Sequence, residues 1–361
     1  MKNGQRVIGI TLLGMIILAG CMLASVAYGS NLIPIGQVLQ ALQNPDSGTF
    51  EASVVWARIP RTVFGVLAGA ALGVSGALMQ AVTRNPIADP SVLGVNTGAS
   101  LFVVIGIAWM HITSSQQYIW LAFAGAALTA VFVYGIASVG YGGPTSIKLA
   151  LAGTATGTAL SALVNTIMLP DSSVMKEFRF WQVGSISGTS WGEIRTILPY
   201  LLVGFVLAVI LIPALNALAL GDELAAGLGV NVQLVRALAA LGGVLLCAAT
   251  TALAGPIGFV GLMVPHFVRL TLGADLKTVI PLSALYGAAL LVLADVLGRV
   301  LGSPGELEVG IVTAVLGAPV FILVAKKAKV RSLWTNRTFL CGRGLPKDTV
   351  ALFWQPLCSS F

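Results

Sequence analysis

The chain has 361 residues, of which 57% are hydrophobic and only 9% charged, and its formal net charge is +7. A soluble domain carries roughly 25% charged residues, so most of the exterior of this protein must face lipid. The positive charges are scattered between apolar runs, which argues against a nucleic-acid-binding patch. The cysteines show no metal-ligand spacing, so we expect neither a zinc site nor a disulfide framework; they are Cys21, Cys247, Cys341 and Cys358.

The apolar runs are long enough to cross a membrane, which takes about 20 residues in a helix. Nine such runs stand near 7–27, 62–82, 92–110, 118–139, 148–169, 194–215, 234–254, 279–300 and 309–325. A tenth run, near 257–268, is short enough to be re-entrant on length alone. The sequence therefore predicts an all-α polytopic membrane protein whose helices form one bundle.

The placement of basic residues decides the topology, because Lys and Arg favour the cytoplasmic side of short loops. With ten crossings and the N-terminus inside, only six of the 20 basic residues lie outside: Arg58, Arg61, Lys176, Arg179, Arg195 and Arg299. A short run that did not cross would carry the basic group at 326–331 to the outside. We predict ten crossings with both termini cytoplasmic.

The first run also resembles a signal sequence, because it follows Lys2 and Arg6 and contains LAGC at 18–21. A lipoprotein signal could end in this way. The apolar run continues past Cys21, however, so a spanning helix over 7–27 accounts for it better. Cleavage remains the alternative.

Two long segments, 28–61 and 170–193, fall outside, and Trp181 and Trp191 in the second are candidate interfacial anchors. The runs that start at 62 and 234 each open a block of four helices, and the blocks enter from opposite sides. Opposite entry sides are expected for the two halves of an inverted repeat, although the sequence similarity between the blocks is too low to prove one.

In the second run, Gly65, Gly69 and Gly73 form overlapping GxxxG steps, which predict a close helix crossing. Asp295 is an acid deep in an apolar run, and such acids are usually functional. A proton-coupled carrier would use it as a titrating group. The simpler interpretation is an ion pair with Arg299, four residues later on the same helix face.

The two ends of the predicted bundle carry different signals. ARIPR at 57–61 sets Arg58 and Arg61 on the side that disfavours arginine, where they contact lipid headgroups or receive carboxylates from an outer partner. Between the sixth and seventh runs, ALGDELAAGLGVNV at 219–232 predicts one or two small helices at the cytoplasmic surface. These are either a simple connection or a docking element.

Catalytic motifs are missing from the sequence. There is no GxxxxGK[ST] loop for ATP, no HExxH and no paired catalytic carboxylates, so we expect a chain that is not an enzyme and has no cofactor.

Five blocks, in this order along the chain, carry a resemblance to a known family. They are RIPR at 58–61, GAALGVSGALMQAVTRNPIADPSVLGVNTGAS at 69–100, GPIGFVGLMVPHFVRL at 255–270, LLVLADVLGR at 290–299 and ELEVGIVTAVLGAPVFILV at 306–324. They resemble the FecCD-type permeases, which are the membrane subunits of type II ABC importers for iron-siderophores, haem and cobalamin. The resemblance covers about residues 1–330, a single transmembrane domain; the tail at 331–361 departs from the family pattern.

The resemblance implies ten helices, a bacterial cytoplasmic membrane, and a homodimer or paired heterodimer of permeases that encloses the path. It also implies cytoplasmic ATP-binding subunits and an extracytoplasmic substrate-binding protein as partners. By position, Arg58, Arg61 and Arg299 match arginines that grip acidic residues of that binding protein. The ATPase-coupling residues would be Asp222, Glu223, Ala225, Ala226 and Gly229. Thr145 and Ser146 fall near the cytoplasmic gate of the family.

The function expected from the resemblance is import of a metal chelate by alternating access, driven by a separate ATPase. An iron(III)-siderophore is the expected substrate, and haem and cobalamin are alternatives. A secondary transporter that uses Asp295 is the alternative from a different class, and a membrane-embedded enzyme is a third.

Overall fold

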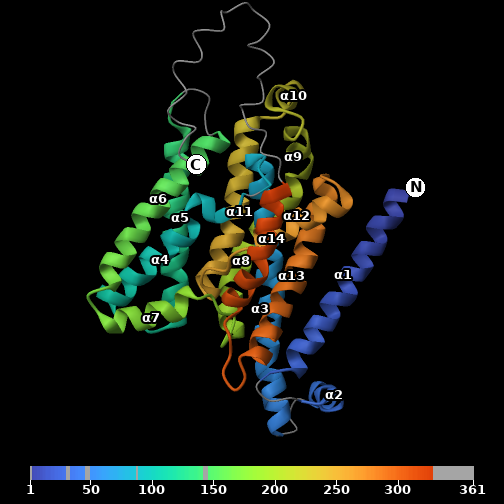
Figure 1. Ribbon diagram of the computed structural model, residues 1–361, viewed down its shortest axis with the longest axis vertical. Helices are drawn as coiled ribbons and strands as arrows, with labels where there is room; N and C mark the ends of the chain where they lie inside the picture. The colour runs from blue at the N-terminus through green and yellow to red at the C-terminus, as the bar shows by residue number, and fades with distance from the viewer. Residues whose placement is uncertain (1, 30–32, 45–48, 87, 141–144, 328–361) are drawn as a thin grey trace, which may run out of the picture. The chain divides into compact units, whose positions relative to one another are not determined.

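The computed structural model describes residues 2–29, 33–44, 49–86, 88–140 and 145–327. Over these residues the protein consists of helices and turns without a strand, so the predicted all-α class is confirmed (Figure 1). In chain order the elements are α1 (Lys2–Ala27), α2 (Ile35–Gln43), α3 (Phe50–Thr83), η1 (Pro90–Leu93), α4 (Val95–Ile105), η2 (Gly106–Met110), α5 (Ser115–Ser138), α6 (Ser146–Met168), α7 (Ser172–Gln182), α8 (Trp191–Ile210), α9 (Ile212–Leu218), α10 (Asp222–Gly227), α11 (Val232–Ala254), α12 (Val260–Leu272), α13 (Leu276–Leu301) and α14 (Val309–Lys327). The tail at 331–361 lies outside the described residues.

Each predicted run falls on one helix, or on two consecutive helices. Among the described residues, seven helices are long and apolar enough to span a membrane: α1, α3, α5, α6, α8, α11 and α13. Val95–Met110, Val260–Leu272 and Val309–Ile322 are shorter apolar helices. The crossing number of ten, which counts all three of these, therefore stays a prediction.

The centre of the bundle is the crossing of α3 with α13, within the compact unit of residues Met1–Phe321. A Cβ atom on Gly69 would lie 2.3 Å from the carbonyl oxygen of Gly287, and one on Gly73 would lie 2.2 Å from that of Ser283. Only glycine permits this approach, so the predicted close crossing is confirmed at Gly69 and Gly73. Gly65 meets only side chains, at 3.2 Å or more, and lies at the looser end of the crossing.

Helix α3 begins twelve residues before the predicted start at 62, because its first turns are stabilised outside the apolar run. The Thr49 side chain caps the helix by accepting a hydrogen bond from the Ala52 amide. Ala52 and Val55 are buried against α2, and the Trp56 indole donates to the carbonyl of Ala41 in that helix. The extension places ARIPR on a rigid helix instead of in a loop.

The two long connecting segments also fold into helices. In the predicted outer segment 170–193, α7 begins at an Asp171 cap, and in the predicted inner segment 219–232, α10 is the small surface helix expected there. The predicted run at 194–215 is divided at Leu211 into α8 and α9.

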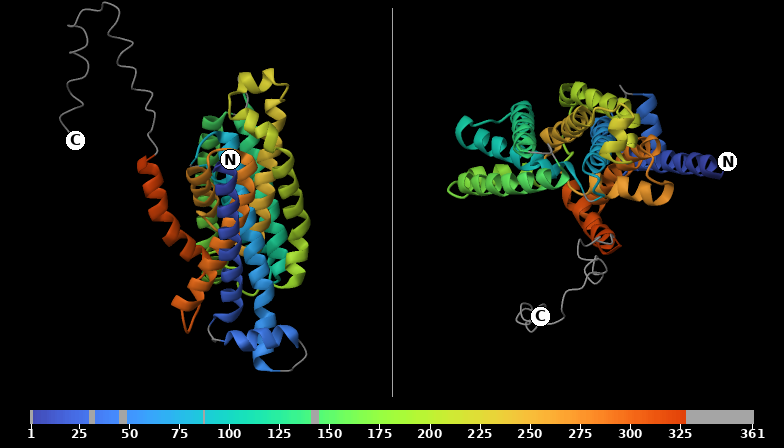
Figure 2. Two further views of the ribbon diagram at one scale, coloured as in Figure 1. Left: turned by 90° about the vertical axis from the view of Figure 1, so that its right-hand side faces the viewer. Right: turned by 90° about the horizontal axis from the view of Figure 1, so that it is seen from above.

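The helices α1 and α6 lie on opposite sides of the bundle in Figure 1 and in the view from above in Figure 2. The N-terminus and α10 lie toward one end, and α2 lies toward the other. Following the predicted topology, we call the α10 end the inner end and the α2 end the outer end.

Candidate functional site

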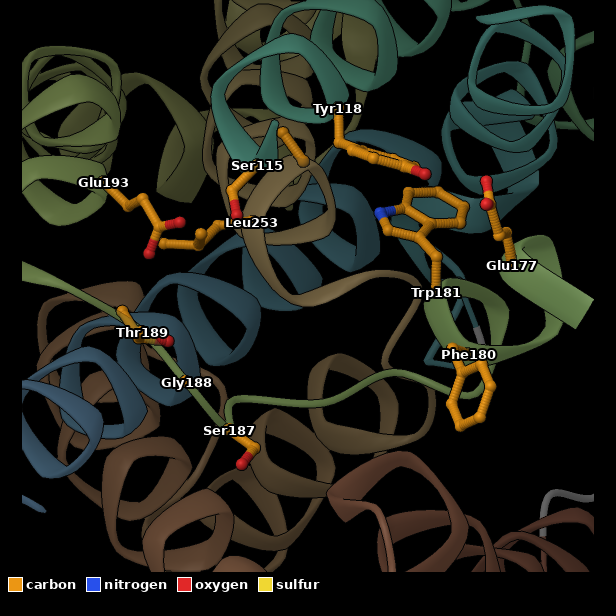
Figure 3. Close-up of a pocket in the computed structure, with 11 residues that line it drawn as sticks. Ser115, Tyr118, Glu177, Phe180, Trp181, Ser187, Gly188, Thr189, Glu193 and Leu253 are labelled. Atoms are coloured by element: carbon orange, nitrogen blue, oxygen red, sulfur yellow. The ribbon is translucent and has the colours of Figure 1, made fainter. Parts of the chain in front are cut away.

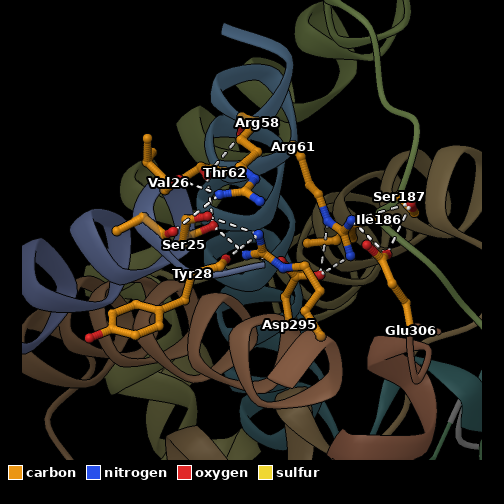
Figure 4. A network of polar contacts seen from close by, with 12 residues as sticks. Ser25, Val26, Tyr28, Arg58, Arg61, Thr62, Ile186, Ser187, Asp295 and Glu306 are labelled. Atoms are coloured by element: carbon orange, nitrogen blue, oxygen red, sulfur yellow. Dashed lines mark hydrogen bonds and ion pairs between the residues drawn. The ribbon is translucent and has the colours of Figure 1, made fainter. Parts of the chain in front are cut away.

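The outer end contains a network of charged side chains centred on Arg61 (Figure 4). The Nε and Nη2 atoms of Arg61 donate to Oδ1 of Asp295, at 3.1 and 2.7 Å. Its Nη1 donates to Oε2 of Glu306 at 2.8 Å and to the hydroxyl of Ser187 at 3.3 Å. The side chain of Arg61 thus ties α3 to α13, to the segment after α13 and to the α7–α8 loop.

The other two arginines of the network bind the end of α1. The Nη1 atom of Arg299 donates to the carbonyls of Ser25 and Tyr28, at 2.8 and 2.9 Å. The Nη1 atom of Arg58 donates to the carbonyls of Val26 and Ala27, at 2.9 and 3.2 Å. The last carbonyls of a helix have no partner within it and carry the negative end of its dipole. Two guanidinium groups therefore cap α1.

Asp295 forms the predicted ion pair with Arg299, with 2.8 Å between Oδ2 and Nη2. The sequence did not indicate its second partner, Arg61, which reaches it from α3. Only 3% of the Asp295 side chain and 2% of the Arg299 side chain are exposed. The carboxylate is thus held between two cations in the packed interior. Among the described residues neither Oδ2 of Asp295 nor Nε of Arg299 has a hydrogen-bond partner, so the contact between Asp295 and Arg299 is an ion pair without hydrogen-bond geometry.

The three predicted docking arginines differ in their exposure. Arg299 is 1% exposed, so its guanidinium faces the interior of the protein. The Arg61 side chain is 12% exposed, and Arg58 is partly buried. Direct contact with a partner is therefore open to Arg58 and Arg61 but not to the guanidinium of Arg299, and the docking role of all three remains a proposal.

A pocket of about 340 Å³ adjoins this network, because Ser187 belongs to both (Figure 3). Trp181, Tyr118 and Glu177 lie on one side of the pocket, and Glu193 lies on the opposite side. The Nε1 atom of Trp181 is buried there without a hydrogen-bond partner among the described residues. Trp181 is therefore half-buried in a pocket wall, whereas Trp191, the other predicted anchor, is 45% exposed.

At the inner end, Asp222 holds α10 against the bundle. Its carboxylate pairs with Arg84, which ends α3, and with Nη2 of Arg236 in α11 at 2.9 Å. Of the predicted coupling residues, Ala225 is fully buried, whereas Glu223, Ala226 and Gly229 are exposed. The apolar side chains exposed beside them are Leu220, Leu224 and Leu228. This end therefore presents an apolar surface rimmed by charge.

Asp275 also lies at this end, where it holds α9 and α13 together. It caps α13 by accepting a hydrogen bond from the Lys277 amide at 2.9 Å. The Asn216 amide donates to the same carboxylate oxygen at 2.8 Å. The bonds from the Lys277 amide and from Asn216 lower the pKa of the Asp275 carboxyl below its usual value, because they stabilise the charged form.

The predicted gate residues stand at the start of α6. The Thr145 side chain is exposed and caps that helix by accepting from the Lys148 amide at 3.3 Å. The Ser146 side chain lies outside the described residues. The gate assignment therefore stays a prediction.

Several residues of the outer network were missed by the sequence analysis: Ser25, Ser187 and Glu306. The Ser25 hydroxyl forms a hydrogen bond with the Thr62 hydroxyl at 2.7 Å and accepts one from Nη2 of Arg299 at 2.8 Å. Glu306 had one available signal, since it opens the last of the five family blocks. Among the described residues, no three His, Cys, Asp or Glu side chains gather where they could hold a metal ion.

A model of the FecCD transport family matches residues 16–327. The chain belongs to the FecCD transport family. The predicted family is therefore confirmed, and a member of this family is a multi-pass membrane permease, a transport subunit of an ABC importer and not an enzyme.

Similar FecCD proteins agree with this assignment. The Fe(3+)-citrate import system permease protein YfmD of Bacillus subtilis is 44% identical over 305 residues, covering 84% of this chain and 90% of that protein. The ferric enterobactin transport system permease protein FepD of Escherichia coli is 41% identical over 307 residues, covering 84% and 90%. A solved structure described as an inward-facing conformation of a metal-chelate type ABC transporter is 26% identical, with a TM-score of 0.76 and coverage of 90% and 99%.

Proposed function

We propose that this FecCD permease imports an iron(III) chelate across the cytoplasmic membrane by alternating access, driven by ATP hydrolysis in separate subunits. The observation that carries the proposal is the family match over residues 16–327, with relatives named as permeases for Fe(3+)-citrate and ferric enterobactin. An iron(III)-siderophore is the proposed substrate, and haem and cobalamin are the alternatives.

The outer end is proposed to receive an extracytoplasmic substrate-binding protein through Arg58, Arg61 and Arg299. Arginine recognises carboxylates through charge-assisted, often bidentate hydrogen bonds, so acidic side chains of the binding protein are the expected partners. Reversing Arg58 and Arg61 to Glu should weaken binding at least ten-fold and leave membrane insertion intact. Unchanged affinity in a pull-down would contradict this role.

The inner end is proposed to dock on the ATP-binding subunit through the segment from Asp222 to Gly229. Leu224 and Leu228 are 61% and 66% exposed there, which supports an apolar contact of this kind. The buried Ala225 contributes packing beneath that surface, and Asp222 holds the segment in place. The predicted positive-inside topology, with both termini cytoplasmic, supports this proposal, because it would turn the α10 end toward cytoplasmic ATP.

A second permease subunit is proposed to complete the path against α6. The exposed side chains of α6 include small and hydroxyl-bearing ones, beside the larger apolar Ile147, Leu151 and Leu163; the small and hydroxyl-bearing ones are Thr154, Ala155, Thr158, Ala162 and Thr166. The three threonine hydroxyls donate to carbonyls one turn earlier, at 2.8 to 2.9 Å, so they stay satisfied in an apolar environment. A face of this kind suits a wide path shared by two subunits.

A secondary transporter that titrates Asp295 is less well supported. Both carboxylate oxygens of Asp295 are engaged by arginines, at 2.7 and 2.8 Å, and the side chain is 3% exposed. The carboxylate is thus enclosed by two structural ion pairs, which support a packing role rather than a carrier role.

The test is uptake of radiolabelled iron chelates into proteoliposomes that contain the full transporter. Uptake should require ATP and the ATP-binding subunits, with the binding protein on the opposite side, and should persist without any ion gradient. Uptake that needed a proton gradient and ignored the ATPase would refute the proposal. Parallel assays with ferric citrate, a catecholate siderophore, haem and cobalamin identify the substrate.

A further inference from the structure

The docking residue Arg61 is already occupied in this structure. All three nitrogens of its guanidinium group donate hydrogen bonds, two to Asp295 and one to both Glu306 and Ser187. These bonds use four of its five N–H groups, so a carboxylate from a partner can bind Arg61 through two hydrogen bonds only by replacing one of these acceptors.

The two acidic partners of Arg61 differ in how easily they can be replaced. Asp295 is 3% exposed and is held from its other side by Arg299. Glu306 is 33% exposed, and Arg61 is its one ion-pair partner among the described residues. A group that approaches from outside therefore meets Glu306 before Asp295.

The position of Glu306 favours its release. It belongs to the segment that joins α13 to α14, and its only other polar side-chain partner in the described chain is the hydroxyl of Ser187, at 3.4 Å. This ion pair is open to water at the Glu306 end, and solvation of the carboxylate weakens it. The same arginine facing a partner carboxylate in a closed interface gains more, because the interface excludes that water.

We propose that Glu306 is an internal substitute for the carboxylate of the docking partner, and that docking exchanges one for the other on Arg61. The inference rests on the proposed docking function and extends it. Asp295 keeps Arg61 oriented throughout, while Glu306 lowers the affinity of the outer surface for acidic groups until the partner arrives. Once Glu306 has left, Arg61 and Arg299 share the single carboxylate of Asp295, and this excess of positive charge attracts the incoming acidic group.

The test compares three variants of the assembled transporter in nanodiscs with the purified substrate-binding protein of the same importer. Glu306→Gln removes the competing charge, and binding should tighten about three- to ten-fold, mainly through slower dissociation. Glu308→Gln is the matched control, because Glu308 lies two residues away and its side chain makes no ion pair among the described residues. It should change affinity by less than about two-fold, through the association rate alone.

The third variant, Arg61→Glu, separates the two proposals. If Arg61→Glu binds like the wild type, the docking role itself fails. If Arg61→Glu abolishes binding while Glu306→Gln matches Glu308→Gln, docking stands and the exchange is refuted. Weaker binding by Glu306→Gln would also refute the exchange, because it would mean that Glu306 positions Arg61 for the partner instead of competing with it.

Discussion

Replacing Asp295 with Asn distinguishes a structural carboxylate from a proton-coupling one. The substitution keeps the size of the side chain and one acceptor oxygen, but removes the charge that Arg61 and Arg299 share. The expected result is a less stable permease whose remaining uptake still depends on ATP and ignores a proton gradient.

The magnitude follows from the burial of the pair. Removing one partner of a buried ion pair costs about 3–5 kcal/mol, because the other charge is left without compensation. The Arg299 side chain is 2% exposed, so it cannot turn to water, although the carbonyls of Ser25 and Tyr28 still accept from it. Glu306 still compensates Arg61, at 2.8 Å. We therefore expect a loss of about 3 kcal/mol, near the lower limit.

A thermal unfolding assay on the purified permease measures this loss. A thiol-reactive dye reports unfolding, because Cys21 and Cys247 are 8% and 3% exposed in the folded protein; the two tail cysteines are first replaced by serine. A loss of this size corresponds to a fall in Tm on the order of 5 °C for a chain of this length. Glu308→Gln, with the same change of charge, should melt with the wild type. An Asp295→Asn variant that melted normally but lost gradient-driven uptake would refute the reasoning.

Three further predictions concern the helix crossing and the inner end. Gly69→Ala should cost about 1–3 kcal/mol in the same assay, because its Cβ would lie 2.3 Å from a carbonyl oxygen, whereas Gly135→Ala, with nothing within 4 Å, should show no loss. Asp222→Ala should speed amide hydrogen exchange in α10 and weaken binding of the ATP-binding subunit. The Tm should stay nearly unchanged, because the two ion pairs of Asp222 are partly exposed. Equal exchange rates in the variant and the wild type would contradict the role of Asp222 in holding α10. Folding lowers the pKa of the Asp275 carboxyl, so its charged form stabilises the folded protein. This stabilisation is complete at a pH above the unfolded pKa of about 3.9 and is lost as the pH falls through the lower folded pKa. Asp275→Ala should therefore melt below the wild type at pH 7, and the difference should shrink below about pH 4; a gap that is constant with pH would contradict this assignment.

The helical elements were largely predictable because a lipid-facing helix must be apolar along its whole length. The ends of the helices were not. Helix α3 continues outward to Phe50, through polar residues held by a Thr49 cap and by packing on α2, and hydropathy does not record such contacts. The small helix α10 was expected from its short amphipathic sequence, whereas the two arginines that hold it come from α3 and α11.

The candidate site divides in the same way. The pairing of Asp295 with Arg299 followed from the periodicity of one helix, because residues four apart share a face. The roles of Arg61 and Glu306 did not follow, since their contact joins residues 245 positions apart. Nor could the sequence predict that the two arginines differ in exposure. The Arg61 side chain is 12% exposed at the outer end, whereas Arg299 is 1% exposed and caps α1.

The sequence by itself determined the class of the protein, its apolar runs and its family, because composition, periodicity and local motifs are properties of the chain in one dimension. The tertiary structure alone decided which charges meet. An arginine on the outer side of a membrane protein can bind a partner, a lipid or a helix end, and the choice depends on the carbonyls and carboxylates that packing brings within 3 Å. Packing places Arg299 against the carbonyls at the end of α1. It places Arg61 between the buried carboxylate of Asp295 and the more exposed carboxylate of Glu306.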